Sequence, residues 1–277
     1  MPPPSSTEPL PPGFDDDPLG PPVRAVPVGQ PLRWLQRGWA DLMTSPVPGV
    51  VHGAAAFLFG LALLVVAGQQ FWVLAGAFTG FLIVAPIVAT GLYEVSRALE
   101  RGEPGQLADA LAVWRRRDGR LVRFGLLLAL AGTGWVMTSA SLVIGFAGAP
   151  VKGPADFLQV VVLGSDSWLF EAWLVLGALL AAPVFASTVV ALPLLLDRPN
   201  VRLMQAVLTG WRAVMASPEA LGLWAALILG LTVLAMATAL VGLLLVVPLL
   251  AHASWHAYRD LVEPADESVS GGGTRPQ

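Results

Sequence analysis

The sequence predicts an all-α protein, a polytopic membrane helical bundle with six transmembrane helices. Three observations predict this fold class: the composition, the long uncharged intervals and the uneven distribution of basic residues. The chain of 277 residues is 55% hydrophobic and only 13% charged, whereas a soluble domain carries roughly a quarter charged residues. No charged residue lies between Glu219 and Arg259, or between Asp41 and Glu94. Uncharged apolar runs of this length are typical of membrane spans.

The two ends of the chain differ in composition from the rest. The first 30 residues contain ten prolines and an acidic run, Asp15–Asp17, and they lack the apolar core of a signal peptide. We therefore expect residues 1–30 to form a disordered, proline-rich cytoplasmic tail. Residues 263–277 are expected to form a second cytoplasmic tail, which leaves residues 31–262 as the membrane domain.

Six segments of this domain are expected to cross the membrane. The last two come from one uncharged interval, residues 220–258, which as a single helix would measure about 58 Å. The hydrocarbon layer is about 30 Å thick, so a hairpin with its turn near Ala237–Gly242 fits better. The expected spans are 48–68, 72–94, 122–147, 169–193, 220–238 and 240–257.

The basic residues predict the orientation. In this topology all fifteen arginines lie on one side of the membrane, the side of the two tails and of the connections 95–121 and 194–219. The single lysine, Lys152, lies on the other side, in the connection 148–168. Because Lys and Arg are retained on the cytoplasmic side, we expect both termini to be cytoplasmic. The expected location is the bacterial inner membrane, and the expected partner is the lipid bilayer. A net charge of −3 gives no indication of nucleic acid.

An internal repeat organises the domain. The stretch "APIVATGLYEVSRALERGEP" (85–104) aligns without a gap, at an offset of 97, with "APVFASTVVALPLLLDRPNV" (182–201). "WADLMTSP" (39–46) likewise resembles "WRAVMASP" (211–218). We therefore expect three parallel units, each consisting of a short amphipathic helix followed by a hairpin of two spans. The units are residues 31–97, 104–196 and 199–260.

The three short helices are expected to lie in the headgroup layer. Their apolar residues recur at intervals of three and four, opposite arginines, which suits an interfacial helix. Packing against the cytoplasmic loops is the alternative. The apolar stripes are Leu32, Leu35, Trp39 and Leu42; Leu107, Leu111 and Trp114; and Val201, Met204, Leu208, Trp211 and Met215. Tryptophans gather at membrane interfaces, so Trp34, Trp39, Trp114, Trp211 and Trp255 are all expected to be interfacial anchors.

Four motifs in order carry a resemblance to a known family. They are "RWLQRGWADLMTSP", "APIVATGLYEVSRALERGEP", "LPLLLDRPNVRLMQAVLTGWRAVMASP" and "HASWHAYRDLVEP". Over roughly residues 30–262 the chain resembles a bacterial family of uncharacterised integral membrane proteins, whose members are sometimes labelled cytochrome c oxidase subunit I-like. Haem–copper chemistry needs about six intramembrane histidines on several helices, and this chain has three in all. The resemblance therefore implies a membrane protein without an established activity.

A histidine pair is the candidate metal site. His252 and His256 are four residues apart, so they share one face of a helix. With His52 and Glu94 they could bind Zn²⁺ or another divalent cation. The alternative is a structural tie in which hydrogen bonds join helix ends. Either way we expect the pair to face the bundle, close to Glu94.

The sequence contains no motif for nucleophilic, metalloprotease or nucleotide chemistry. It contains no cysteine, which excludes thiolate metal sites and iron–sulfur clusters, and no cofactor is expected. We therefore expect a non-enzymatic scaffold, or a protein that handles a lipid or another apolar solute. One alternative is a permease for a neutral small molecule. The other is a redox protein that binds a metal or haem through its histidines.

Overall fold

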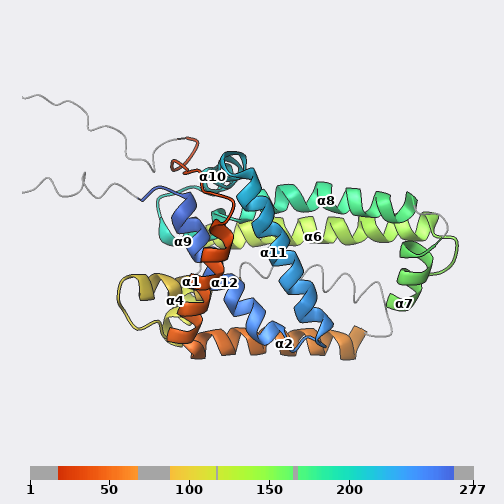
Figure 1. The fold of residues 1–277 in the computed structure, drawn as a ribbon, viewed down its shortest axis with the longest axis horizontal. Coiled ribbons are helices and arrows are strands. Elements are labelled where there is room, and N and C mark those ends of the chain that lie inside the picture. The colour runs from red at the N-terminus through yellow and green to blue at the C-terminus, as the bar shows by residue number, and fades with distance from the viewer. Residues whose placement is uncertain (1–17, 68–87, 117, 165–167, 265–277) are drawn as a thin grey trace, which may run out of the picture.

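The fold is helical throughout the part of the chain that the structure, a computed structural model, describes (Figure 1). That part comprises residues 18–67, 88–116, 118–164 and 168–264. Helices account for 79% of the structure, and the described residues form no strand. The all-α fold class is therefore confirmed.

The long helices occur where the sequence predicts spans, and shorter helices lie between them. Four segments are long and apolar enough to cross a membrane: Pro46–Val65, Gly119–Phe146, Trp168–Asp197 and Pro218–Ala237. The helices are α1 (Gln30–Thr44), α2 (Pro46–Ala67), α4 (Thr90–Glu100), α5 (Leu107–Arg115), α6 (Gly119–Phe146), α7 (Pro154–Asp156), α8 (Trp168–Thr188), α9 (Ala191–Asp197), α10 (Leu203–Ala216), α11 (Pro218–Ala237) and α12 (Leu243–Leu261). A π-helical turn, Phe157–Val162, follows α7.

The structure describes the two remaining expected spans to different extents. Most of the expected span 72–94 lies outside the described residues, which resume at residue 88. The expected span 240–257 corresponds to α12, whose last turns carry Arg259 and Asp260. Four candidate spans are therefore established among the described residues. The helix α12 is a fifth long helix, apolar at its start and charged in its last turns.

The expected hairpin between the last two helices is present. The helix α11 ends at Ala237 and α12 begins at Leu243. Ala239 and Leu240 have φ values of 53° and 69°, a left-handed conformation that side chains with a Cβ rarely adopt. The Thr238 hydroxyl accepts a hydrogen bond from the amide of Gly242 at 2.9 Å. The turn therefore ends on Gly242, but its two left-handed positions are occupied by Ala239 and Leu240.

Two serine–proline corners link an amphipathic helix to a long one. Ser45 joins α1 to α2 with φ −131° and ψ 76°, and Ser217 joins α10 to α11 with φ −141° and ψ 56°. The proline that follows each serine disfavours the helical region for it and suits the first turn of the next helix. The matching motifs of the sequence therefore form matching corners.

The segment Trp168–Asp197 is interrupted between α8 and α9. The break falls at Val189 and Val190, and Pro193 lies just beyond it. A proline ring clashes with the carbonyl four residues earlier, here that of Val189, and supplies no amide hydrogen. Pro193 therefore separates the short helix α9 from α8.

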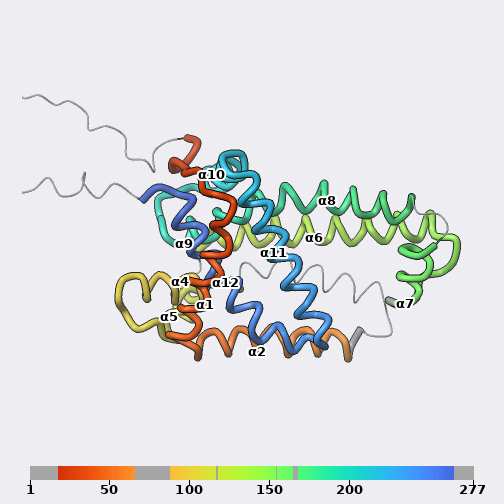
Figure 2. The backbone as a smooth tube through the Cα atoms, in the orientation of Figure 1, coloured from red at the N-terminus to blue at the C-terminus, as the bar shows by residue number. Residues whose placement is uncertain are grey.

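The helices diverge from a common end. In Figure 1, α6 and α8 lie side by side along the long axis, α2 runs along the opposite edge, and α11 crosses obliquely. At the end from which these helices diverge, α1, α4, α9 and α12 pack together, and we call this region the hub. Figure 2 shows that α1 and α12 lie side by side although they come from opposite ends of the chain.

Glycines allow two helices to approach α12 closely. A Cβ placed on Gly38 of α1 would lie 2.6 Å from the backbone nitrogen of Ala253, and one on Gly53 of α2 would lie 2.3 Å from the carbonyl oxygen of Leu244. Both separations are far shorter than van der Waals contact. The backbones of α1 and α2 therefore pack directly on α12.

Several of residues 18–29 contact the end of α12 and the α10–α11 corner. Val23 pairs with Val262 in an isolated antiparallel bridge, and the amide of Arg24 donates to the Leu261 carbonyl at 2.8 Å. The amide of Val26 donates to the hydroxyl of Ser217 at 2.9 Å. The proline-rich composition hides this contact because hydrogen bonds between distant backbone groups leave no local sequence pattern.

We expect Gly38→Ala to destabilise the protein by roughly 1–3 kcal/mol, the usual cost of overpacking. Thermal unfolding of the purified protein in detergent would measure it. Gly222→Ala is the matched control, because Gly222 also lies within a helix and a Cβ there meets no atom within 4 Å. An equal loss of stability in both variants would show that the α1–α12 approach is not tight.

Candidate functional site

A cleft of about 640 Å³ opens at the hub. It lies where the ends of α4, α9 and α12 meet, and we call it the arginine cleft. Four guanidinium groups and two carboxylates line it, so the lining carries a net charge of +2. Its lining residues are Arg97, Glu100, Arg101, Asp197, Arg198, Trp255, Arg259 and Pro264.

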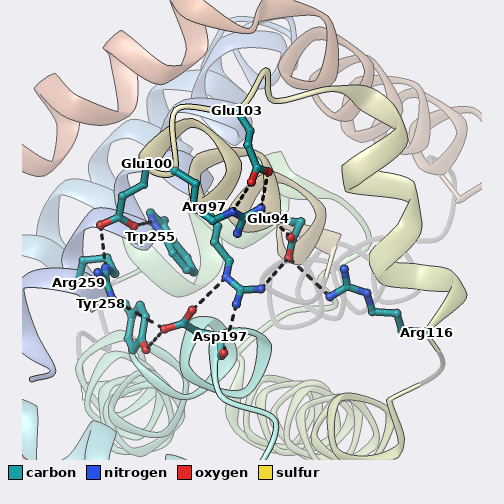
Figure 3. A network of polar contacts seen from close by, with 10 residues as sticks. Glu94, Arg97, Glu100, Glu103, Arg116, Asp197, Trp255, Tyr258 and Arg259 are labelled. Carbon is teal, nitrogen blue, oxygen red and sulfur yellow. Dashed lines mark hydrogen bonds and ion pairs between the residues drawn. The ribbon is translucent and has the colours of Figure 1, made fainter. Parts of the chain in front are cut away.

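Two ion pairs fix the walls of the arginine cleft (Figure 3). Arg97 of α4 binds Asp197 of α9, with Nε 3.0 Å from Oδ1. Arg259 of α12 binds Glu100 of α4, with Nε 2.9 Å from Oε1. Because α4 takes part in both pairs, it connects α9 to α12.

Neutral donors complete the coordination of both carboxylates. The Tyr258 hydroxyl donates to Asp197 Oδ2 at 2.7 Å, and the Trp255 indole donates to Glu100 Oε2 at 3.2 Å. Burial and the neighbouring Asp197 raise the pKa of Tyr258 well above its ordinary value, so the hydroxyl keeps its proton. Burial opposes the charge of Arg259, but Glu100 and Asp197 outweigh it and raise its pKa.

Glu94 belongs to this network and not to the histidine pair. Its carboxylate is buried and lies 3.5 Å from Arg97, 3.8 Å from Arg101 and 3.8 Å from Arg116. Three arginines around one carboxylate neutralise a charge that would otherwise be costly to bury. We expected the histidine pair to lie close to Glu94, but the carboxylate that binds His256 is that of Asp41.

The histidine pair belongs to a chain of hydrogen bonds that joins three helices. His256 Nε2 donates to Asp41 Oδ2 of α1 at 2.8 Å. The Ser96 hydroxyl of α4 donates to the same oxygen at 2.6 Å and lies 2.7 Å from Nδ1 of His252. Because the hydroxyl has only one hydrogen, Nδ1 of His252 must be the donor in that contact. Both histidines therefore face the bundle, as expected, through Asp41 and Ser96.

The third histidine lies on the neighbouring helix α2. His52 Nδ1 donates to the carbonyl of Pro48 at 2.8 Å, and its Nε2 faces the backbone of Gly91 in α4. Nε2 of His252 is buried and has no hydrogen-bond partner among the described residues. Within those residues no group of three or more His, Asp or Glu side chains is arranged to hold a metal ion. The metal site at His252 and His256 stays a prediction.

A second polar cluster fastens α1 to the end of α12. Asp260 accepts hydrogen bonds from Gln30 at 2.6 Å, from the Trp34 indole at 2.8 Å and from the guanidinium of Arg37. Burial opposes ionisation of Asp260, but these three donors outweigh it and hold its pKa below the ordinary value. The carboxylate therefore stays charged and bound to α1 near neutral pH.

The expectation that all five tryptophans near this end are interfacial anchors is wrong for two of them. Trp34 and Trp255 are fully buried, and Trp34 packs edge-on against Trp224 of α11 at 5.6 Å between ring centroids. Their indole nitrogens bind Asp260 and Glu100, so they belong to the hub. By contrast Trp39, Trp114 and Trp211 are 43%, 48% and 41% exposed.

The four candidate spans among the described residues define the class: an integral membrane protein of unknown function. Residues 73–197 match the family described as predicted integral membrane protein (DUF2189). The expected resemblance to a family of uncharacterised integral membrane proteins is thereby confirmed. No curated protein and no solved structure matches the chain.

The double variant His252→Gln and His256→Gln tests the two interpretations of the histidine pair. We expect a loss of thermal stability that is the same with Zn²⁺ and with a chelator, because each unpaired buried partner costs about 1–3 kcal/mol. Ser141→Ala, at an exposed position of α6, is the control. If a chelator destabilises the unmodified protein but not the double variant, the pair is a metal site.

Proposed function

We propose that the protein is a non-enzymatic membrane scaffold that binds lipid at the inner leaflet of the bacterial inner membrane. The observation that carries the proposal is the outward-facing apolar surface of three amphipathic helices, α1, α5 and α10. Each of these helices exposes a tryptophan beside other large apolar side chains. The exposed residues are Leu32, Trp39 and Met43 on α1, Leu111 and Trp114 on α5, and Met204, Trp211 and Met215 on α10.

These exposed stripes suit contact with lipid better than contact with water. A helix with one apolar face and one basic face lies in the headgroup layer, with its apolar side chains in the acyl region. On α10, Trp211 is exposed while the opposite face, including Ala206 and Ala213, is fully buried in the protein. The helix α10 therefore packs on the protein with one face and presents an apolar surface with the other.

The proposed topology has six spans with both termini in the cytoplasm. The four candidate spans, the helix α12 and the apolar stretch 72–94 together supply six. The helices α4, α5, α9 and α10, which with their flanking residues carry Arg97, Arg101, Arg115, Arg198 and Arg212, lie at one end of the molecule, and α7, which follows Lys152, lies at the other (Figures 1 and 2). This separation supports the orientation inferred from the distribution of basic residues.

The proposed architecture has three units, at residues 31–97, 104–196 and 199–260. An amphipathic helix precedes a long apolar helix in each, as α1 precedes α2, α5 precedes α6 and α10 precedes α11. The matching corners at Ser45 and Ser217 support the pairing of the first and third units. The last helical segments of the units, α4, α9 and the end of α12, meet at the hub.

The permease alternative finds little support in the hydroxyl groups of α6. The Thr133 hydroxyl donates to the Ala129 carbonyl at 2.9 Å, and the Thr138 hydroxyl donates to the Gly134 carbonyl at 2.7 Å. Hydroxyls that bond within their own helix are satisfied at a lipid-facing surface. The scaffold proposal therefore accounts for them without a polar path.

Reporter fusions test the topology. We expect fluorescence, and no phosphatase activity, from fusions after residues 110, 205 and 265, because arginine-rich segments stay in the cytoplasm. A fusion after residue 158 should give the reverse. Phosphatase activity at residue 265 would contradict an even number of spans.

Spin labelling tests lipid contact, and the absence of cysteine makes single labels simple to introduce. We expect nitroxides at Met43 and Met215 to collide more with oxygen than with a water-soluble nickel complex in vesicles. Their neighbours Thr44 and Ala216 are the matched controls, since they are also exposed but point about 100° away on the same helices. Equal accessibility within each pair would show that the stripes do not enter the membrane.

A further inference from the structure

We propose that the arginine cleft binds a phosphate group, either the headgroup of an anionic phospholipid or a soluble phosphate compound. The phosphate chemistry follows from the cleft itself, whereas the lipid source rests on the proposed function. The cleft is formed by residues from α4, α9 and α12 and by the segment that follows α12. It lies at the end of the molecule that also carries the amphipathic helices α1, α5 and α10 (Figure 1).

The charge of the lining favours an anion. The guanidinium groups of Arg97, Arg101, Arg198 and Arg259 outnumber the carboxylates of Glu100 and Asp197 by two. A phosphodiester carries one negative charge and a phosphomonoester carries nearly two near neutral pH. Glu94 and Glu103 pair with two of these arginines from outside the lining, and Arg116 pairs with Glu94. Counting them, five arginines face four carboxylates, and the excess of one positive charge matches a phosphodiester.

The two carboxylates hold Arg97 and Arg259 in place. Asp197 accepts from Arg97 and Tyr258, and Glu100 accepts from Arg259 and Trp255. Their negative charge is directed at these partners on the wall of the cleft. Preorganised donors lose little side-chain entropy when a ligand binds, which strengthens binding.

The arginines keep donors for a ligand. A guanidinium has five N–H groups in a planar fork that matches the oxygens of phosphate. The hydrogen bond from Arg259 to Glu100 uses Nε–H, and the terminal nitrogens of Arg259 have four more. Arg101 binds Glu103 through Nε and Nη2, at 3.0 Å and 2.9 Å, and both side chains are exposed. Glu103 is therefore the group with which a phosphate would compete for Arg101.

The volume also fits. A cleft of about 640 Å³ lies within the range of about 300–1,000 Å³ that small-molecule sites occupy. It exceeds what a bare phosphate ion needs, so there is room for the glycerol or alcohol that a headgroup carries. The buried face of Trp255 closes one side of the cleft. The shape thus suits a phosphate ester.

Thermal unfolding of the full chain in neutral detergent tests the proposal. The probes are inorganic phosphate, glycerol phosphate, and short-chain phosphatidylglycerol or phosphatidylcholine, at constant ionic strength. We expect the anionic esters to raise the melting temperature and phosphatidylcholine to have a much smaller effect. A shift with glycerol phosphate identifies a soluble source, and a shift with phosphatidylglycerol alone identifies a lipid source.

Three variants test whether the phosphate compounds bind in the arginine cleft. Arg101→Gln should weaken apparent affinity about tenfold, the usual effect of losing one charge-assisted hydrogen bond. Glu103→Gln should strengthen it, because it removes the competing carboxylate. Arg115→Gln is the matched control, since Arg115 is exposed and does not line the cleft. The glutamine variants alter exposed side chains, so folding is preserved.

Two results would overturn the proposal. One is that no phosphate compound raises the melting temperature, and the other is that Arg101→Gln and Glu103→Gln bind like Arg115→Gln. Neither result bears on the amphipathic helices, whose membrane contact the spin labels measure separately. Failure of the cleft and failure of the lipid scaffold are therefore distinguishable.

Discussion

The ion pair between Arg97 and Asp197 holds the hub together, and the rest of the structure depends on it. It joins α4 to α9, and the pair between Arg259 and Glu100 extends the connection to α12. Partly buried pairs of this kind contribute little net stability, but removing one partner is costly because the other charge is left unpaired. Their main effect is to specify which helix ends meet. In a membrane, apolar helices have little preference among neighbours, so these ion pairs determine which helix ends come together.

A second constraint acts between the first and last helices. The close approach at Gly38 places α1 directly on the backbone of α12, and Asp260 receives three donors from α1. The relay from His256 through Asp41 to Ser96 then ties this pair to α4. The polar side chains of the hub thus form connected networks of hydrogen bonds and ion pairs. Two buried atoms, Oε2 of Glu94 and Nε2 of His252, have no hydrogen-bond partner among the described residues.

Much of the fold was predictable, because its signals are local. Uncharged runs predict the long helices, the length of residues 220–258 predicts the last hairpin, and Pro193 predicts the break before α9. The site was less predictable. Asp41 and Ser96 have no unusual sequence context, and they become partners of the histidines only when α1, α4 and α12 meet. The burial of Trp34 could not be predicted either, since tryptophan is common both at membrane interfaces and in protein cores.

The pairing of α1 with α12 also has a consequence for how the protein is made. Trp34 and its partner Asp260 are 226 residues apart in the chain, so α1 leaves the ribosome long before its binding surface exists. Contacts this distant slow folding because a large loop must close first. Until α12 has been synthesised, the face of α1 that packs on it lacks that partner within the chain. The last helix to be synthesised is therefore the one that completes the structure, and a chain that stops before α12 would leave α1 without its docking site.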